Sequence, residues 1–207
     1  MCFSASASFV ASGGLTVLGA ATFVAARKKD KVLVAIPILF GIQQCFEGIQ
    51  WLYLERGSSS LWAGYGFLFF ALLVWPFYVP AFVWLLDKPR RPLLRWFVIA
   101  GALVSLYFLG LLAFSPLHIR ERGNCVAYAF HYPDKWVVLP YLAVVLGALF
   151  VSSRVIFRWF GVAIFAMAVL AWRLYETNFI SVWCFFAAAV SSLFFIFVQR
   201  RRSRRGH

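Results

Sequence analysis

One acidic residue, Glu47, lies inside a long apolar run, in the segment QQCFEGIQW. A charge at the centre of a bilayer costs roughly 3 kcal/mol or more, so such residues usually face protein or water and have partners. At the angular spacing of a helix, the polar side chains of this segment share about a third of the circumference, whereas Cys45 lies on the opposite face. The members of this polar stripe are Gln43, Gln44, Glu47, Gln50 and Trp51.

Other polar groups are expected at the same depth as Glu47. At about 1.5 Å per residue, Glu47 lies roughly 10 Å below the outer end of its helix. Groups on other helices reach a similar level, and this convergence predicts an outward-opening site for a small molecule or a metal ion. The candidate binding residues are Glu47, Gln43, Gln44, Gln50, Trp51, Tyr107, Tyr141, Arg173 and Cys184.

Three other interpretations of Glu47 stay open. It could be a buried structural carboxyl that keeps its proton and hydrogen-bonds to Tyr or Gln, or that pairs with Arg173. The protein could instead be a transporter or channel that uses Glu47 to couple ions or protons. It could also be a structural subunit of a membrane complex, or a homo-oligomer, that associates through stripes of small residues. No catalytic residue is assigned.

The four cysteines, Cys2, Cys45, Cys125 and Cys184, are not arranged as a CxxC motif. Cys2 and Cys125 are expected on the outer, oxidising side, where they could form a disulfide. Alternatively, Cys2 and Cys125 with His131 could bind zinc or copper, because thiolate and imidazole ligands suit both metals. The spacing of these residues matches no known metal motif, and free thiols are the third possibility.

The sequence lacks the residues that several known kinds of membrane protein need for their cofactors. The three histidines, His118, His131 and His207, all fall outside the apolar runs, so paired imidazole ligands for haem are missing. The last run contains no lysine that could hold retinal in a Schiff base. The sequence therefore gives no support for haem or retinal, and no cofactor is assigned.

The composition requires a membrane protein. Of the 207 residues, 63% are hydrophobic and only 13% are charged, whereas soluble domains are near half apolar and a quarter charged. Apolar runs of about 18 residues or more indicate transmembrane helices. The predicted fold is an all-α bundle of seven spans in one domain, residues 1–199, followed by a basic tail, 200–207. The spans are Ser4–Ala26, Val32–Leu54, Ser60–Leu86, Leu93–Phe114, Trp136–Ser153, Val155–Trp172 and Asn178–Val198.

The basic residues predict the orientation of the bundle. Fifteen of the 20 Lys and Arg residues fall on one side of the spans and five on the other. By the positive-inside rule, the amino terminus is outside and the carboxyl terminus is cytoplasmic, in the inner membrane if the protein is bacterial. Because the charge follows the loops, we expect the tail to meet anionic lipid headgroups rather than nucleic acid. The first run is not a cleaved signal peptide, since its basic cluster follows the run instead of preceding it.

Two local patterns refine this plan. The outer loop 115–135 is predicted to hold a short β-hairpin, because Gly123-Asn124 supplies a turn and CVAYAFHY alternates after it. Its aromatic face would either cover the bundle or lie in the interfacial aromatic belt. In the third span, Pro76 and Pro80 each remove a helical hydrogen bond and are predicted to bend the helix.

Three segments, MCFSASASF, EGIQW and SVWCFFAA, together resemble an uncharacterised family of multi-spanning bacterial membrane proteins whose members open with MCFSA-x-ASF. The resemblance implies a membrane location and a bacterial setting. It carries no catalytic residue over, because no activity is assigned to the family. It marks as residues to test Cys2, Glu47, Trp51, Trp183 and Cys184.

Overall fold

Helices make up most of the chain in the computed structural model, which describes residues 4–26, 31–123, 125–130, 137–174 and 179–203, and their side chains except for those of 25 and 192–203. A π-helical segment, Phe69–Val74, joins the third helix to the fourth, so that 61–86 is one continuous helical rod. The helices are α1 (Ala5–Ala25), α2 (Lys31–Leu54), α3 (Leu61–Leu68), α4 (Trp75–Leu86), α5 (Arg91–Phe114), α6 (Val138–Val151), α7 (Val155–Leu174) and α8 (Phe179–Ser203).

Five helical stretches are long and apolar enough to cross a membrane: Ala5–Val24, Lys31–Leu54, Leu61–Leu86, Arg91–Phe114 and Val155–Leu174. This confirms the prediction of a mostly helical chain with the character of a membrane protein. The predicted fifth span, 136–153, corresponds to α6, whose 14 residues extend only about 21 Å. A full crossing needs about 20 residues, so the count of seven spans stays a prediction.

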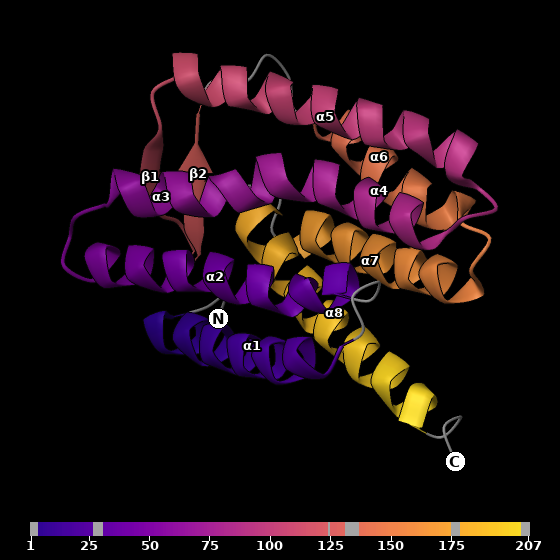
Figure 1. Ribbon diagram of the computed structural model, residues 1–207. Coiled ribbons are helices and arrows are strands. Elements are labelled where there is room, and N and C mark those ends of the chain that lie inside the picture. Colours follow the sequence, from indigo (N-terminus) through magenta and orange to yellow (C-terminus); the bar gives the residue numbers. More distant parts are fainter. Residues whose placement is uncertain (1–3, 27–30, 124, 131–136, 175–178, 204–207) are drawn as a thin grey trace.

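The helices pack side by side with their long axes roughly aligned, and α8 crosses the bundle at a tilt (Figure 1). Close approach relies on small residues, as is usual where lipid removes the hydrophobic drive for association. On α2, a side chain at Gly41 would collide with Thr16 of α1, and one at Gly48 would collide with Phe9. Ser12 also donates to the Gly41 carbonyl oxygen at 2.7 Å. These contacts hold α1 antiparallel against α2.

The third span contains a π-helical segment before Pro76, whereas Pro80 lies inside the regular helix α4. Proline at position 76 has no N–H and its ring crowds the preceding turn, so the helix widens over Phe69–Val74 before α4 begins. Helix α5 packs directly on this distortion: Gly101 lies against the Pro76 carbonyl group, and Ser105 donates to the Leu73 carbonyl oxygen at 2.7 Å. The predicted bends at Pro76 and Pro80 stay predictions. Trp75, the first residue of α4, reaches Gln43 of α2.

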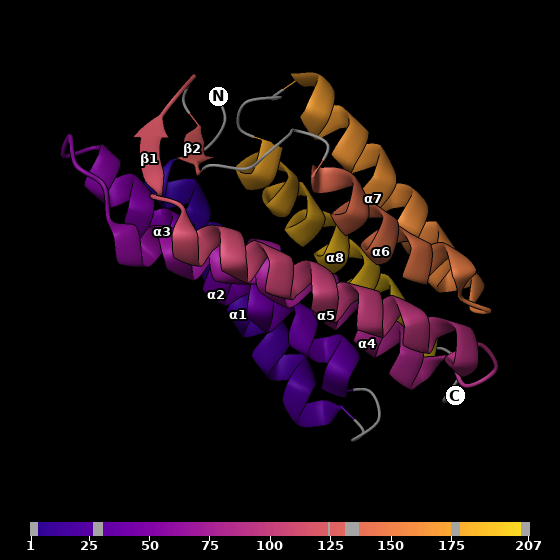
Figure 2. The same cartoon turned by 90° about the horizontal axis from the view of Figure 1, so that it is seen from above.

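The predicted hairpin is present and covers one end of the bundle, which we call the hairpin end (Figure 2). Strands β1 (His118–Glu121) and β2 (Val126–Ala129) pair antiparallel, with Ile119 opposite Tyr128. Gly123 has a φ of +60°, as the turn requires. The Tyr128 ring stacks on Phe67 of α3 at 4.8 Å, so the aromatic face lies on the bundle.

The opposite end of the molecule carries a second buried carboxylate, Asp87, directly after α4. Its side chain has no exposed surface. It accepts hydrogen bonds of 2.6 Å from the Ser152 hydroxyl, the Ser153 hydroxyl and the Ser153 N–H. Burial alone raises the pKa of Asp87, but these hydrogen bonds and one from the Arg90 N–H lower it below its ordinary value of 3.8. Asp87 therefore ties the α4–α5 turn to the α6–α7 turn.

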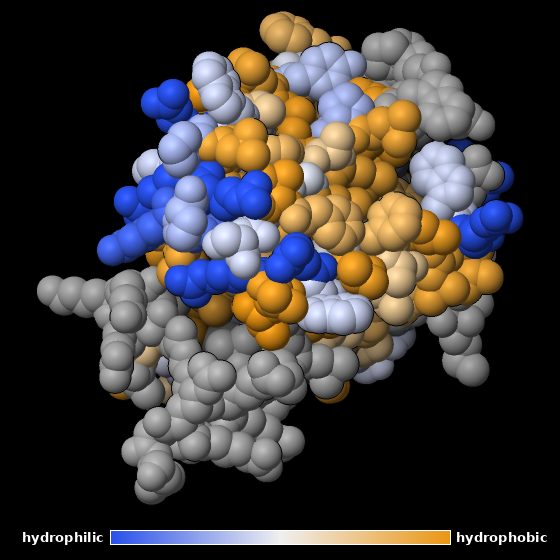
Figure 3. All heavy atoms as spheres, turned by 90° about the vertical axis from the view of Figure 1, so that its right-hand side faces the viewer, coloured by the Kyte–Doolittle hydropathy of each residue, from blue (hydrophilic) through white to orange (hydrophobic). Residues whose placement is uncertain are grey.

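Exposed basic side chains surround this second end, which Figure 3 shows with hydrophilic groups next to hydrophobic surface. The Arg91 guanidinium donates to the last carbonyl groups of α4, those of Trp84 and Leu85, at 3.2 and 3.1 Å. Cations are favourable at a helix carboxyl terminus. The exposed basic residues of this end include Lys88, Arg90, Arg95, Arg154 and Arg158.

Candidate functional site

The predicted polar stripe of α2 faces the interior of the bundle. Glu47 has no exposed surface, and neither have Gln43, Gln44 and Gln50. Both oxygens of the Glu47 carboxyl group accept hydrogen bonds: Oε2 from the Gln44 Nε2 at 3.2 Å, and Oε1 from the Ser181 hydroxyl of α8. No ion pair reaches Glu47 from the described part of the chain. Both of these hydrogen-bond partners are neutral.

Gln43 connects the stripe to two other helices. Its Oε1 accepts from the Trp75 indole N–H of α4 at 2.7 Å. Because an indole N–H can only donate, this bond fixes which end of the Gln43 amide is the oxygen. The Gln43 amide nitrogen faces the Cys184 thiol of α8 without reaching hydrogen-bonding geometry. Both N–H donors of the Gln43 amide are thus left over at the centre of the bundle.

The stripe continues toward the hairpin end. Gln50 accepts from the backbone N–H of Ser60 at 3.3 Å, which fixes the orientation of its amide as well. Trp51 is 5% exposed. Above the stripe, burial raises the pKa of the Tyr128 phenol well above its ordinary value, and the neighbouring Glu47 and Cys184 add to the rise. Tyr128 therefore closes the stripe from the hairpin side.

The buried polar side chains around Glu47, which we call the polar layer, include many atoms without a hydrogen-bond partner. Native proteins leave few buried polar groups unsatisfied, so each calls for an explanation. Within the described residues, seven buried side-chain atoms have no hydrogen-bond partner. Ser8 belongs to the group by position, because the Gly41–Ser12 and Gly48–Phe9 contacts place it at the level of Glu47. The atoms are Ser8 Oγ, Gln43 Nε2, Gln44 Oε1, Gln50 Nε2, Trp51 Nε1, Tyr128 Oη and Trp183 Nε1.

Donors predominate among these atoms. The two amide nitrogens and the two indole nitrogens can only donate, the two hydroxyl groups can donate or accept, and one atom, Gln44 Oε1, can only accept. The fixed amides of Gln43 and Gln50 prevent an exchange of roles by rotation. The layer is therefore suited to a group that offers acceptor oxygens. It is poorly suited to a metal ion, because neither amide N–H nor indole N–H can be a ligand.

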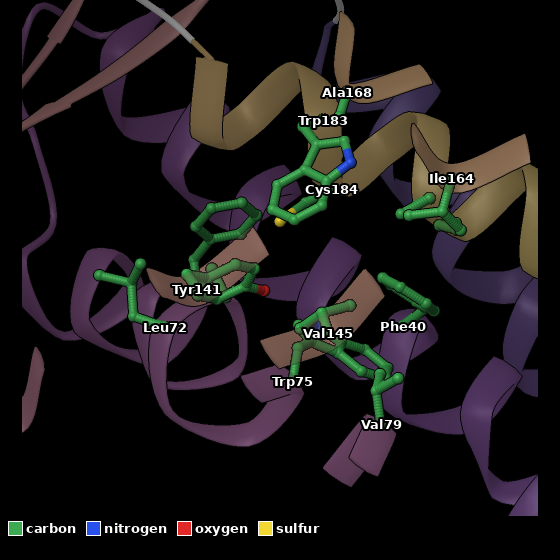
Figure 4. Packing of buried hydrophobic residues seen from close by; sticks show 14 of the residues in the cluster. Phe40, Leu72, Trp75, Val79, Tyr141, Val145, Ile164, Ala168, Trp183 and Cys184 are labelled. Carbon is green, nitrogen blue, oxygen red and sulfur yellow. The ribbon is translucent and has the colours of Figure 1, made fainter. Parts of the chain in front are cut away.

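An apolar cavity of about 40 Å³, measured as space open to the centres of water molecules, lies directly below this layer, away from the hairpin. Trp75, Tyr141, Trp183 and Cys184 belong to both the layer and the cavity wall. Figure 4 shows Tyr141, Trp183 and Cys184 grouped on one side of this interior, across from residues such as Phe40 and Val79. The rest of the wall is apolar apart from Ser191: Ile36, Phe40, Val79, Phe82, Val145, Leu149, Phe160, Ile164 and Ala187.

Two predicted site residues lie elsewhere. Tyr107 is 46% exposed on α5, with its ring edge against Phe108. It has the expected depth but lies on a different face of its helix, because its neighbour Phe108 turns inward instead. Arg173 is exposed at the end of α7, and its pairing with Glu47 is not found. The other predicted members are buried: Glu47, Gln43, Gln44, Gln50, Trp51, Tyr141 and Cys184.

Three further residues around Glu47 were not among the predicted site residues, and Trp183 was marked only by the family resemblance. In the sequence, Ser181 looks like one member of a small-residue stripe, Trp75 like an ordinary aromatic residue of a span, and Tyr128 like part of a surface hairpin. A signal was available for Ser181 and Trp183, since both lie within one turn of Cys184 on α8. Nothing local in the sequence places Tyr128 next to Glu47, because a hairpin must fold back over the bundle to bring it there.

The cysteines divide into two groups. Cys125 is disulfide-bonded, whereas Cys45 and Cys184 are free. Cys2 and His131 lie outside the described residues, so the Cys2–Cys125 disulfide and the metal site of Cys2, Cys125 and His131 stay predictions. Among the residues described, no cluster of three or more His, Cys, Asp or Glu side chains could hold a metal ion.

A protein-family model described as a family of unknown function, DUF6629, matches residues 1–207. No curated protein and no solved structure matches the chain. These comparisons agree with the resemblance to an uncharacterised family that the motifs of the sequence indicate.

Proposed function

Because the chain belongs to this family of unknown function, we propose a function from the geometry: the polar layer around Glu47 binds a small neutral molecule through its acceptor oxygens. The observation that carries the proposal is the group of fully buried donors without partners. Leaving such groups unpaired costs about 1–3 kcal/mol each. A ligand with carbonyl, ether or hydroxyl oxygens would remove much of that cost.

The donor set favours a small molecule over the metal ion that the sequence left as an alternative. A bound cation would need oxygen, thiolate or imidazole ligands. Around Glu47 the unpaired groups are mostly N–H donors, and the two carboxyl oxygens already accept hydrogen bonds. An anionic ligand is also disfavoured if Glu47 is ionised, because two negative charges would share one buried space.

We further propose that the bundle crosses the membrane seven times, with the hairpin end outside. The exposed basic residues of the Asp87 end support this orientation by the positive-inside rule. The binding layer would then lie in the outer half. The orientation can be tested in intact cells with two added cysteines, Ser58→Cys and Arg90→Cys, each compared with the parent protein, whose free Cys45 and Cys184 set the background. A membrane-impermeant thiol reagent should label only the first, and labelling of the second alone would contradict the proposed orientation.

The binding proposal can be tested with a pair of tyrosine variants. Tyr128→Phe removes an unpaired hydroxyl group from the layer, whereas Tyr107→Phe removes one from the exposed face of α5. Protein purified in lipid nanodiscs is denatured, and released small molecules are quantified by mass spectrometry. We expect a compound at near-stoichiometric amount in the wild type and in Tyr107→Phe. Loss of one hydrogen bond in Tyr128→Phe should weaken binding about fivefold.

Two results would contradict this proposal. One is that the wild-type protein releases no compound above the level of empty nanodiscs. The other is that the tyrosine variants and Glu47→Gln all retain a compound equally, because the layer would then take no part in holding it.

A second function, proton coupling, is supported by the neutral surroundings of Glu47. Within the described residues, the Glu47 carboxyl group is bound by Ser181 and Gln44, and a group held by such neutral partners can exchange a proton without breaking an ion pair. In that case proteoliposomes containing the protein should take up protons under an imposed gradient, and Glu47→Gln should abolish the uptake. If uptake is no faster than in empty liposomes, this second function is excluded.

A further inference from the structure

We infer that the ligand of this site is amphiphilic: an apolar ring or short chain that carries a carbonyl or similar acceptor at one end. The inference rests on the proposed function and specifies its ligand class. Its basis is the position of the apolar cavity, which shares part of its wall with the donor layer. The shared residues are Trp75, Tyr141, Trp183 and Cys184.

The shared wall forms a boundary between two chemical environments. Toward the hairpin, the Trp75 indole donates to Gln43, whose other amide end is unpaired. Away from the hairpin, the same Trp75 ring stacks on Phe40 at 3.9 Å and borders an aliphatic and aromatic wall. A molecule that spans this boundary needs an acceptor at one end and an apolar body at the other.

Trp183 provides the most specific contact. Its indole N–H is buried without a hydrogen-bond partner, and its ring belongs to the cavity wall. The ring is held in place by Phe179, stacked at 5.3 Å, and by the edge of Tyr141 at 5.2 Å. Trp183 therefore contributes a buried donor close to an apolar wall, the combination of a few polar groups with apolar lining that small-molecule sites usually have.

The dimensions of the cavity limit the apolar part of the ligand. A single water needs roughly 10–15 Å³ by the same measure, and the cavity offers about 40 Å³. Once the radius of the water is added, the space suits one six-membered ring or a short chain. Apolar walls of this kind hold water poorly and accept apolar molecules instead. A lipid-soluble ketone therefore fits better than a sugar or an amino acid.

The test uses 4-fluoroacetophenone, which combines one carbonyl group with one ring, and follows its binding to the full chain in nanodiscs by fluorine NMR. Ala187→Phe fills the cavity, whereas Ala166→Phe makes the same change on the exposed face of α7. We expect the wild type and Ala166→Phe to bind the probe and Ala187→Phe to bind it at least tenfold more weakly. Equal binding by all three would overturn the inference.

Two unlabelled competitors separate this inference from the proposed function. Acetone has the carbonyl group without the ring, and ethylbenzene has the ring without the carbonyl group. If acetone competes as well as acetophenone, the layer binds acceptors, but the amphiphile inference fails. If ethylbenzene competes as well as acetophenone, the donors are unused and the proposed function fails. We expect acetophenone to compete at least tenfold better than either one.

A second variant keeps the test decisive if Ala187→Phe does not fold. Val79→Ala enlarges the same cavity from α4. It should strengthen the binding of the longer ketone 4-fluorobutyrophenone relative to 4-fluoroacetophenone by roughly tenfold, the effect of one or two methylene groups in an apolar pocket. An unchanged ratio would show that the apolar part of the probe lies outside the cavity.

Discussion

Two carboxyl groups, Glu47 and Asp87, are both completely buried, and they differ in what surrounds them. At Asp87, three short hydrogen bonds come from two adjacent serines, and they join two turns of the chain. At Glu47, two donors reach the carboxyl group, while further donors close by have no partner and an apolar cavity lies below. A satisfied buried carboxylate holds the fold together. A buried carboxyl group that lies among unpaired donors is a candidate for ligand binding.

The largest expected effect is on stability, at Asp87. Asp87→Ala leaves the hydroxyl groups of Ser152 and Ser153 and two backbone N–H groups without an acceptor, so we expect the free energy of unfolding to fall by about 3 kcal/mol. Thermal unfolding in detergent micelles measures the change. The control is Glu121→Ala, which removes an exposed carboxylate of β1 and should leave stability nearly unchanged. Equal effects of the two variants would show that Asp87 does not hold the turns.

A pair of amide substitutions compares the two carboxyl groups directly. Asp87→Asn removes the charge that the two serine hydroxyls and the backbone N–H groups of Ser153 and Arg90 stabilise, and it should cost about 1.5 kcal/mol. Glu47→Gln should cost less than about 0.5 kcal/mol, because the new amide can accept from Ser181 and donate to Gln44 Oε1 after that amide rotates. Denaturant unfolding of both variants measures the difference. A larger loss at Glu47 would mean that Glu47 is the structural carboxyl.

Acid should weaken the Asp87 contact by a smaller amount. The pKa of Asp87 is lowered in the folded protein, so ionised Asp87 contributes stability above its ordinary value of 3.8 and that contribution is lost as pH falls through the folded value. We expect the wild type to lose stability relative to Asp87→Asn below pH 3.8, by less than Asp87→Asn costs at neutral pH, because the protonated acid keeps both oxygens. If the stability of the two proteins falls in parallel as the pH is lowered, ionised Asp87 does not stabilise the fold.

The smallest expected effects compare a buried indole N–H that has a hydrogen-bond partner with one that has none. Trp75→Phe and Trp51→Phe remove the same part of a buried ring, but only Trp75 loses a hydrogen bond, the one to Gln43. We expect Trp75→Phe to be less stable than Trp51→Phe by about 1 kcal/mol. Unfolding of the two variants without added ligand measures the difference. If Trp51→Phe costs as much, its N–H has a partner in the folded protein.

Many features of the fold could be predicted from sequence patterns along single helices. Hydrophobic runs indicated the long apolar helices, and the spacing on α2 put Gln43, Gln44, Glu47, Gln50 and Trp51 on one face, all of which the structure buries. The turn at Gly123 could also be predicted, since it depends on local backbone chemistry. The π-helical segment before Pro76 was not predicted. The expected depth of a residue in the membrane predicted the site less well. It placed Tyr107 at the level of Glu47, but it did not predict which face of α5 turns inward.

The sequence by itself determined that a carboxyl group and a polar stripe would be buried, because lipid tolerates neither on a helix surface. Only the tertiary structure determined which residues contact this carboxyl group and this polar stripe. Ser181, Trp75 and Tyr128 come from distant parts of the chain, and their positions depend on how helices rotate and on a hairpin folding back over the bundle. The unpaired donors and the apolar cavity beside them arise only from that assembly, since both are properties of the space between elements.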